Sequence, residues 1–383
     1  MNVNFDVDLY EVMKDSTVRA FFTLVQAGLW EKDVCLSQFG EVDYGRILEL
    51  AQEQSVVGLV AAGLEHVIDV KLPKEDVLQF VGQALLLEQQ NRSMNAFLSR
   101  LVEQMRREGI YTLLVKGQAI AQRYERPLWR ASGDVDLFLS EDNYEKAKTY
   151  LVPLATSVEP EGRYGQHLGM TLEGNVVELH GNLRCGLSSR VDKVLDGVRN
   201  DTFYSGNVSS WSNAGVQTFL LSKENEVFYV FTHILSHFYK GGIGLRQICD
   251  WTRLLWTYRD TMNQSALELL INKAGLMTEW RAFGVFAVEY LGLMKDAVPY
   301  YSEETKWGKK AARIQSFIMA VGNFGHNRDM SYYSTKPYFV RKTMSLGRRA
   351  GDLMNHFCIF PIDTLRFTPR IVINGLKSAA NGE

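Results

Sequence analysis

Two aspartates separated by one residue, Asp134 and Asp136, are the side chains in this sequence best suited to chemistry. They open the segment 134–139 (DVDLFL), which alternates acidic with apolar residues and then becomes wholly apolar. Side chains two apart in a strand share a face, so both carboxylates are expected to point the same way. Like charges this close resist ionising together, and a divalent cation with oxygen ligands, most often Mg²⁺, relieves the repulsion. The pattern predicts a metal-binding strand.

A two-metal site for phosphoryl displacement requires a further carboxylate, and Glu178 is the best candidate. It lies in the apolar segment 176–180 (VVELH), where Glu178 and His180 share one face of a second strand. The segments 167–172 and 175–180, joined by a turn at 173–175, have the pattern of a β-hairpin. This hairpin would place Glu178 beside the two aspartates.

A glycine turn precedes the aspartates. The segment 111–115 (YTLLV) is short, apolar and rich in β-forming residues, and Lys116-Gly117 ends it, which predicts a buried strand. A helix is expected over 118–124, ended by Pro127. Glycine at a strand-to-helix turn lets backbone N–H groups approach an anion, so the turn is a candidate phosphate site.

Together these segments resemble the DNA-polymerase-β-like nucleotidyltransferase superfamily, and most closely a bacterial family of uncharacterised nucleotidyltransferases. The resemblance covers roughly 95–260 and rests on Lys116-Gly117, on 130–137 (RASGDVDL) and on 178–180 (ELH). It implies that Asp134, Asp136 and Glu178 are catalytic and bind the metal. A similar set of His, Arg and Asp falls in the family's helical segment, here His237, Arg246 and Asp250. The residues expected at the nucleotide are Lys116, Gly117, Gln118, Ser132, Gly133, His237 and Arg246.

The resemblance implies an Mg²⁺-dependent nucleotidyltransferase, with a two-metal site and a nucleoside triphosphate as co-substrate. It would transfer a nucleoside monophosphate to an unknown hydroxyl acceptor and release pyrophosphate. The acceptor and the oligomeric state stay open; a small molecule, a protein hydroxyl, a sugar phosphate and an RNA end are all candidates. Gln118 follows Gly117 where the superfamily usually has Ser or Gly. This difference motivates an alternative, a nucleotide-binding or interaction module of the same fold with little or no turnover. A weaker alternative is a purely helical interaction protein.

Composition narrows the class of protein. Of 383 residues, 46% are hydrophobic and 22% charged, as in ordinary globular proteins, and the formal net charge of −2 gives no global attraction to nucleic acid or anionic membrane. Cys35, Cys185, Cys249 and Cys358 form no CxxC pattern, so they indicate neither a disulfide framework nor a zinc site. The N-terminus lacks a signal-peptide pattern, and no apolar run reaches about 18 residues. We expect a cytoplasmic protein.

The remaining segments predict an α+β fold, a small mixed β-sheet nucleotidyltransferase core flanked by N-terminal and C-terminal helical regions. The expected division is 1–109 (helical), 110–215 (core) and 216–383 (helical, with a basic tail segment). Apolar periodicity indicates helices through 9–109, including one long helix at 74–107, and again at 141–151. Residues 181–222 are less regular, and we expect a domain boundary near 205–222. Later helices are predicted at 223–238, 245–255, 264–275, 278–294 and 309–322.

Two further patterns allow competing interpretations. His233 and His237 are four apart, but the Glu of an HExxH motif is missing, so we do not interpret them as a zinc site. Arg246 and Asp250, also four apart, could form a simple ion pair instead of facing a nucleotide.

The segment 336–377 is basic and carries interleaved aromatic residues. It fits a polyanion-binding or membrane-surface patch, and it fits equally a docking segment with buried aromatic and solvated basic side chains. The balanced overall charge favours the second interpretation. Its basic residues are Lys336, Arg341, Lys342, Arg348, Arg349, Arg366, Arg370 and Lys377, and its aromatic residues are Tyr338, Phe339, Phe357, Phe360 and Phe367.

Overall fold

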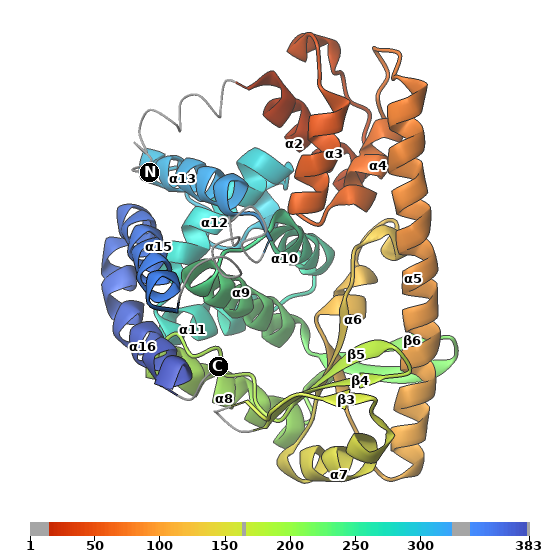
Figure 1. The fold of residues 1–383 in the computed structure, drawn as a ribbon, viewed down its shortest axis with the longest axis vertical. Helices are drawn as coiled ribbons and strands as arrows, with labels where there is room; N and C mark the ends of the chain where they lie inside the picture. Colours follow the sequence, from red (N-terminus) through yellow and green to blue (C-terminus); the bar gives the residue numbers. More distant parts are fainter. Residues whose placement is uncertain (1–14, 163–165, 324–337, 381–383) are drawn as a thin grey trace.

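The computed structural model describes the backbone of residues 15–162, 166–323 and 338–380. It describes the side chains of the same residues except those of 338–346 and 374–380. A helical region opens this part of the chain. Its last helix matches the predicted limits of 74–107 and runs along one side of the molecule, from the other N-terminal helices down to the sheet (Figure 1). The region consists of α2 (Ser16–Trp30), η1 (Ser37–Phe39), α3 (Tyr44–Glu53), α4 (Val57–Glu65) and α5 (Lys74–Arg107).

Two glycines bring α2 and α4 into direct backbone contact. A Cβ added to Gly28 would lie 1.9 Å from Leu59 O, and one added to Gly63 would lie 2.0 Å from Leu24 O. No side chain fits at either distance, so the close packing of these helices requires glycine on both.

Within the described residues, seven strands form one mixed sheet in the order β3-β4-β5-β2-β1-β7-β6. β2 is parallel to β5 and antiparallel to β1, while β4 and β5 form the predicted hairpin with the predicted limits. The elements of this part are β1 (Leu113–Val115), α6 (Gly117–Ala121), η2 (Pro127–Trp129), β2 (Asp134–Phe138), α7 (Glu141–Leu151), η3 (Val152–Leu154), β3 (Ser157–Val158), β4 (His167–Leu172), β5 (Asn175–His180), α8 (Ser189–Tyr204), β6 (Val208–Asn213) and β7 (Val216–Leu221). The α+β class expected from the sequence is confirmed.

The sheet has one apolar face and one polar face at its centre. Val135, Leu137, Val177 and Leu179 are all buried, in a core shared with residues of α5 and α7. The intervening residues of β2 and β5 must point to the opposite face. That face carries the acidic side chains.

The prediction of irregular structure over 181–222 is wrong. The helix α8 and the β6–β7 hairpin occupy most of this segment. β7 pairs in parallel with β1 and in antiparallel fashion with β6, so it belongs to the same sheet although it begins after the expected boundary at 215. The division into three domains stays a prediction.

Helices make up the C-terminal part, with α15 and α16 on the side opposite α5 (Figure 1). Phe360 and Phe367 are buried, while Phe357 is partly exposed. Arg366 donates to the carbonyl oxygens of Ala274 and Gly275, so here the basic segment docks on the body of the protein. Lys336 and the side chains of Tyr338, Phe339, Arg341, Lys342 and Lys377 lie outside the description. The elements are α9 (Lys223–Lys240), α10 (Leu245–Tyr258), α11 (Gln264–Ala274), α12 (Met277–Leu291), η4 (Lys295–Ala297), α13 (Thr305–Val321), α15 (Tyr338–Ile359) and α16 (Pro361–Ala380).

No helix in the described ranges is both long enough and apolar enough to cross a membrane.

Candidate active site

Strand register brings the acidic side chains together. In the parallel pair of β2 and β5, Asp136 lies opposite Glu178, and Asp134 is two residues earlier on the same face of β2. One carboxylate oxygen from each of the three side chains lies within 4.8 Å of the other two. The structure therefore places the three predicted carboxylates around one point.

Lys116 and His180 both contact the same oxygen of Asp136. The Lys116 Nζ is 2.7 Å from Asp136 Oδ1, and the His180 Nε2 is 2.8 Å from the same oxygen. The side chain of Asp136 is only 2% exposed, so both partners interact with it away from bulk water. Glu178 is flanked in turn by His180, at 3.3 Å, and by His167, at 3.2 Å, both measured from Nε2 to Oε2.

Burial and charge move the pKa values of these groups in opposite directions. Burial, followed by the charge of Asp136, raises the pKa of Asp134. Burial also favours neutral Asp136, but the Lys116 ammonium and the His180 hydrogen bond outweigh it and lower the pKa of Asp136. Hydrogen bonds from His167 and His180 lower the pKa of Glu178. Glu178 is therefore ionised at neutral pH and is a poor proton acceptor there.

The Lys116-Gly117 turn has an unusual backbone. Lys116 has φ 58° and ψ −153°, a region that is essentially reserved for glycine, and Gly117 has φ +42°. A Cβ on Gly117 would lie 3.3 Å from Asp134 O, so the turn lies tightly against the start of β2. Strain of this kind costs on the order of 1–3 kcal/mol and persists only where surrounding contacts enforce it. Here it directs the Lys116 ammonium to Asp136.

Helices α9 and α10 close a cleft over the carboxylates. Its larger lobe, about 390 Å³, extends from Lys116 and Glu178 past His233 and His237 of α9 to Lys240. Its smaller lobe, about 60 Å³, is lined by Gly117 and Asp136 and, from α10, by Arg246. Lys116, Asp134 and His233 line both lobes, so the carboxylates lie where the lobes meet.

The two α9 histidines are neutral at physiological pH. Burial, followed by the charge of Lys116, lowers the pKa of His237 to about 4 and places the pKa of His233 well below its ordinary value. Their Nε2 atoms are 3.1 Å apart, so one imidazole donates to the other. No third metal-ligating atom joins this pair in the described part of the chain.

Among the described residues, Arg246 forms no ion pair with a carboxylate. Its Nη1 donates to Ala131 O at 2.9 Å, and its Nε has no hydrogen-bond partner among the described residues. Burial, followed by repulsion from Arg130, lowers the pKa of Arg246. A half-buried guanidinium with one donor left unpaired favours an anionic ligand in the smaller lobe, which Arg246 lines.

The ion pair between Arg246 and Asp250, one of the two interpretations that their spacing allows, is not formed. Asp250 instead accepts two hydrogen bonds from Arg130, from Nε at 3.0 Å and from Nη2 at 2.6 Å, and a third from Tyr124 Oη at 2.7 Å. Arg130 also donates to Ser132 Oγ. This buried network connects α10 to the loop that leads into the aspartate strand.

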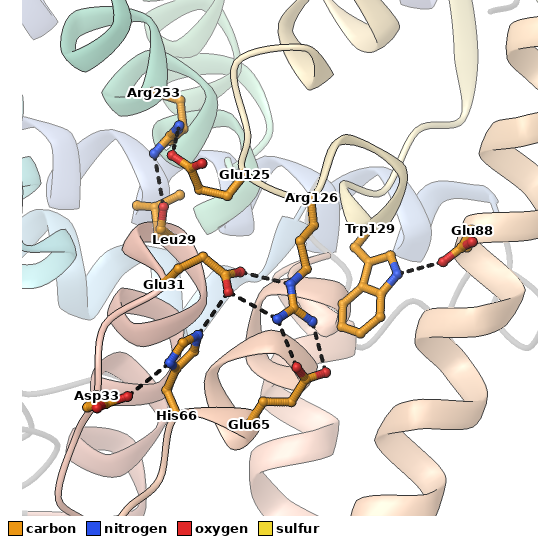
Figure 2. A network of polar contacts seen from close by, with 10 residues as sticks. All are labelled: Leu29, Glu31, Asp33, Glu65, His66, Glu88, Glu125, Arg126, Trp129 and Arg253. Carbon is orange, nitrogen blue, oxygen red and sulfur yellow. Dashed lines mark hydrogen bonds and ion pairs between the residues drawn. The ribbon is translucent and has the colours of Figure 1, made fainter.

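Two other basic residues near the turn also have partners away from the cleft. Arg126 forms ion pairs with Glu31 and Glu65 of the N-terminal region, as Figure 2 shows. The Arg123 guanidinium lies 5.1 Å from the centroid of the Tyr258 ring. Neither is placed to contact a phosphate.

The sequence and the structure were compared with known proteins. Residues 40–292 match a protein family described as uncharacterised nucleotidyltransferase, a match that spans more than half of the chain. The chain belongs to this family. The crystal structure of an antigenic nucleotidyltransferase-like protein from Paracoccidioides brasiliensis is 17% identical, with a TM-score of 0.30, over 48% of this chain and 90% of that chain. No curated protein matches.

The other residues predicted to contact the nucleotide differ in whether they reach the cleft. Gln118 does not face the cleft, because its Nε2 donates to Asn91 Oδ1 of α5 at 2.8 Å and its side chain is buried. Gly133 is exposed, and Ser132 is held by Arg130. His237 and Arg246 line the larger and the smaller lobe, respectively.

Some residues of the cleft in this nucleotidyltransferase family member were not anticipated. His167, Tyr229 and Lys240 all line the larger lobe. The helical spacing of Tyr229, His233 and His237 on α9 could have indicated Tyr229. His167 is different, because only its register opposite His180 brings it to Glu178.

The residues present suit a hard divalent cation. Asp134, Asp136 and Glu178 supply carboxylate oxygens, the ligands that Mg²⁺ prefers. Three carboxylates and the Lys116 ammonium leave a formal charge of −2 (−3 + 1) in a largely buried site. One divalent cation balances that charge.

Proposed function

We propose that this protein is an Mg²⁺-dependent nucleotidyltransferase that transfers a nucleoside monophosphate from a nucleoside triphosphate to a hydroxyl acceptor. The observation that carries the proposal is the convergence of Asp134, Asp136 and Glu178 within 4.8 Å, in a chain of a nucleotidyltransferase family. The strained turn at Lys116 and the unpaired donor of Arg246 support it, because both direct cations to the place where phosphates would lie.

Each side chain has a role that follows from its surroundings. Asp134, Asp136 and Glu178 hold the metal, which when bound supplies Lewis-acid polarisation of the phosphate oxygens. Lys116 and Arg246 neutralise the triphosphate and orient its α-phosphorus toward the acceptor. The low pKa of Glu178 favours a role in binding and orienting over one as a general base.

The reaction then proceeds by in-line displacement. The acceptor oxygen forms a bond to the α-phosphorus, and the bond from that phosphorus to the oxygen bridging to the β-phosphate breaks. Pyrophosphate leaves, and the hydroxyl proton passes to water at the open end of the cleft. The larger lobe, lined by His237 and Lys240, is the space available to the acceptor.

Pyrophosphate release tests this function. Each nucleoside triphosphate is incubated with Mg²⁺ and candidate acceptors, and the products are identified by mass spectrometry. Glu178→Gln should lower the rate by on the order of 10²-fold or more. Glu173→Gln, at the exposed turn of the same hairpin, is the matched control and should keep the wild-type rate. Equal rates for wild type and Glu178→Gln would contradict the proposal.

A second candidate is a nucleotide-binding module with little or no turnover. The position of Gln118 favours it, because this side chain is bonded to α5 and offers nothing to a phosphate at the turn. Binding of a triphosphate with Mg²⁺ but without pyrophosphate release, over all four nucleotides and a broad acceptor panel, would select this alternative.

A further inference from the structure

Glu178 belongs to a second group of potential metal ligands besides the three carboxylates. His167 at the start of β4 pairs directly with His180 at the end of β5, and Glu178 lies two residues before His180 on the same face. The Nε2 atoms of both histidines approach the same oxygen, Glu178 Oε2, at 3.2 and 3.3 Å. One ligand atom from each of the three residues lies within 4.8 Å of the others.

The two distances from histidine nitrogen to Glu178 oxygen, 3.2 and 3.3 Å, match the spacing of ligands around a single small ion. Bonds of about 2.0–2.2 Å in a tetrahedral arrangement keep neighbouring ligand atoms roughly 3.2–3.6 Å apart. The three residues come from two antiparallel strands paired in continuous register from 167 to 180, so a sheet, and not a loop, sets their spacing. The arrangement needs little movement to accept an ion.

The donor types differ from those of the carboxylate group. Two imidazole nitrogens and one carboxylate oxygen form the ligand set of open zinc sites, in which further positions are left for water or substrate. Asp134, Asp136 and Glu178 offer only oxygen, which suits Mg²⁺. Two adjacent sites that share Glu178 would thus prefer different metals.

The surrounding contacts permit His180 to change partner. Its Nε2 now lies 2.8 Å from Asp136 Oδ1, and binding an ion through that nitrogen would remove this contact. Asp136 would still have Lys116 at 2.7 Å and would not be left as an unpaired buried charge. His167, with 46% of its side chain exposed, leaves the site open to the larger lobe.

We propose that His167, Glu178 and His180 form a zinc site next to the magnesium site, with Glu178 shared between them. The site does not depend on nucleotide transfer, so it goes beyond the proposed function. The carboxylates and Lys116 leave a charge of −2, which a single divalent ion neutralises, so a second ion should enter together with the negatively charged triphosphate.

Zinc binding to nucleotide-free protein tests the site. Isothermal titration with Zn²⁺, and Co²⁺ absorption as a report of nitrogen ligation, are measured for wild type, His167→Ala, His237→Ala and Asp134→Asn. His167→Ala should weaken zinc binding by on the order of 10²-fold or more, since even loss of a residue that merely supports a ligand costs 10–100-fold. His237→Ala, which removes an imidazole from the same cleft, should stay within about threefold of wild type. Asp134→Asn removes a neighbouring charge but no proposed zinc ligand, so it should weaken zinc binding less than His167→Ala does.

Three results would overturn the proposal. The first is a zinc affinity of His167→Ala equal to that of wild type, and the second is a zinc affinity that falls in His237→Ala but not in His167→Ala. The third is a zinc affinity that falls only in Asp134→Asn, which would place the ion among the carboxylates. Because His167 is exposed, its variant should fold, and circular dichroism verifies this. Crystals soaked in Zn²⁺ give a second measurement, an anomalous peak between the three side chains; a peak elsewhere would refute the site. No outcome depends on nucleotide turnover, so failure here is distinct from failure of the proposed function.

Discussion

Removing Asp250 should destabilise the protein strongly, because its buried carboxylate is the counter-charge of a buried guanidinium. Its carboxylate pairs with Arg130 through two hydrogen bonds, and the two side chains are 4% and 5% exposed. In Asp250→Ala the Arg130 guanidinium, which cannot lose its proton, would stay buried without a counter-charge. Tyr124 would lose its acceptor as well.

The expected cost follows from that arrangement. Breaking a buried pair by removing one partner costs about 3–5 kcal/mol, and a stranded hydroxyl adds to it. Arg130→Met should cost a similar amount, because it strands the Asp250 charge. The double variant should cost clearly less than the sum of the two single variants, with a coupling energy of about 2 kcal/mol or more.

Urea unfolding followed by circular dichroism measures these free energies, and the Arg246/Asp250 cycle is the control. Arg246 is on the same helix, one turn earlier, but forms no ion pair with Asp250 in the described structure, so its coupling should be below about 1 kcal/mol. Equal coupling in the two cycles, or a loss below about 1 kcal/mol in Asp250→Ala, would refute this reasoning.

Three further changes have defined outcomes. Gly63→Ala places a Cβ 2.0 Å from Leu24 O and should lower the free energy of unfolding in urea by about 3 kcal/mol or more. Gly82→Ala is the control: a Cβ at this exposed position of α5 meets nothing within 4 Å and should raise the free energy of unfolding by up to about 1 kcal/mol. Burial and, after it, the charge of Asp363 raise the pKa of Glu279 from 4.5 to about 8. The free energy of unfolding of the wild type should therefore fall as pH rises from about 5 to 8, by at most about 1.4 kcal/mol per pH unit, and that of Glu279→Gln should not. Parallel plots of unfolding free energy against pH for the two proteins would contradict this prediction. Arg246→Met should weaken binding of a nucleoside triphosphate about 10–100-fold in calorimetry without changing Mn²⁺ binding, and unchanged nucleotide affinity would exclude Arg246 from the phosphate site.

The sequence predicts the part of the fold that depends on local pattern. The alternation in 134–139 and 175–180 specifies strands with one buried face, and the two-residue side-chain period then places Asp134, Asp136 and Glu178 on the other face. The long helix α5 and the hairpin of β4 and β5 follow from periodicity and turn residues in the same way.

The missed elements have weak local patterns. β6 is an edge strand with Ser and Asn at several positions, so one of its faces is polar and its composition resembles a loop. α8 does have apolar residues at helical spacing, at Val191, Leu195 and Val198, but the Gly, Ser and Asn residues on both sides of it obscured that signal.

The sequence does not predict which side chains form ion pairs and hydrogen bonds with each other near the cleft. Asp250 is four residues from Arg246 on α10, yet it pairs with Arg130, because the loop before β2 packs onto α10 and buries both charges. Gln118 turns to Asn91 for a similar reason, since α5 passes behind the turn. His167 reaches Glu178 through strand register. Each of these contacts joins distant segments, and only the folded chain specifies them.

Divalent-cation binding tests the central claim most directly, namely that Asp134, Asp136 and Glu178 form one metal site. Mn²⁺ binding in the presence of a non-hydrolysable nucleoside triphosphate analogue is measured by electron paramagnetic resonance for wild type, Asp134→Asn and Glu173→Gln. We predict that wild type and Glu173→Gln bind Mn²⁺ equally and that Asp134→Asn binds it at least about tenfold more weakly. Equal binding by wild type and Asp134→Asn would contradict the claim.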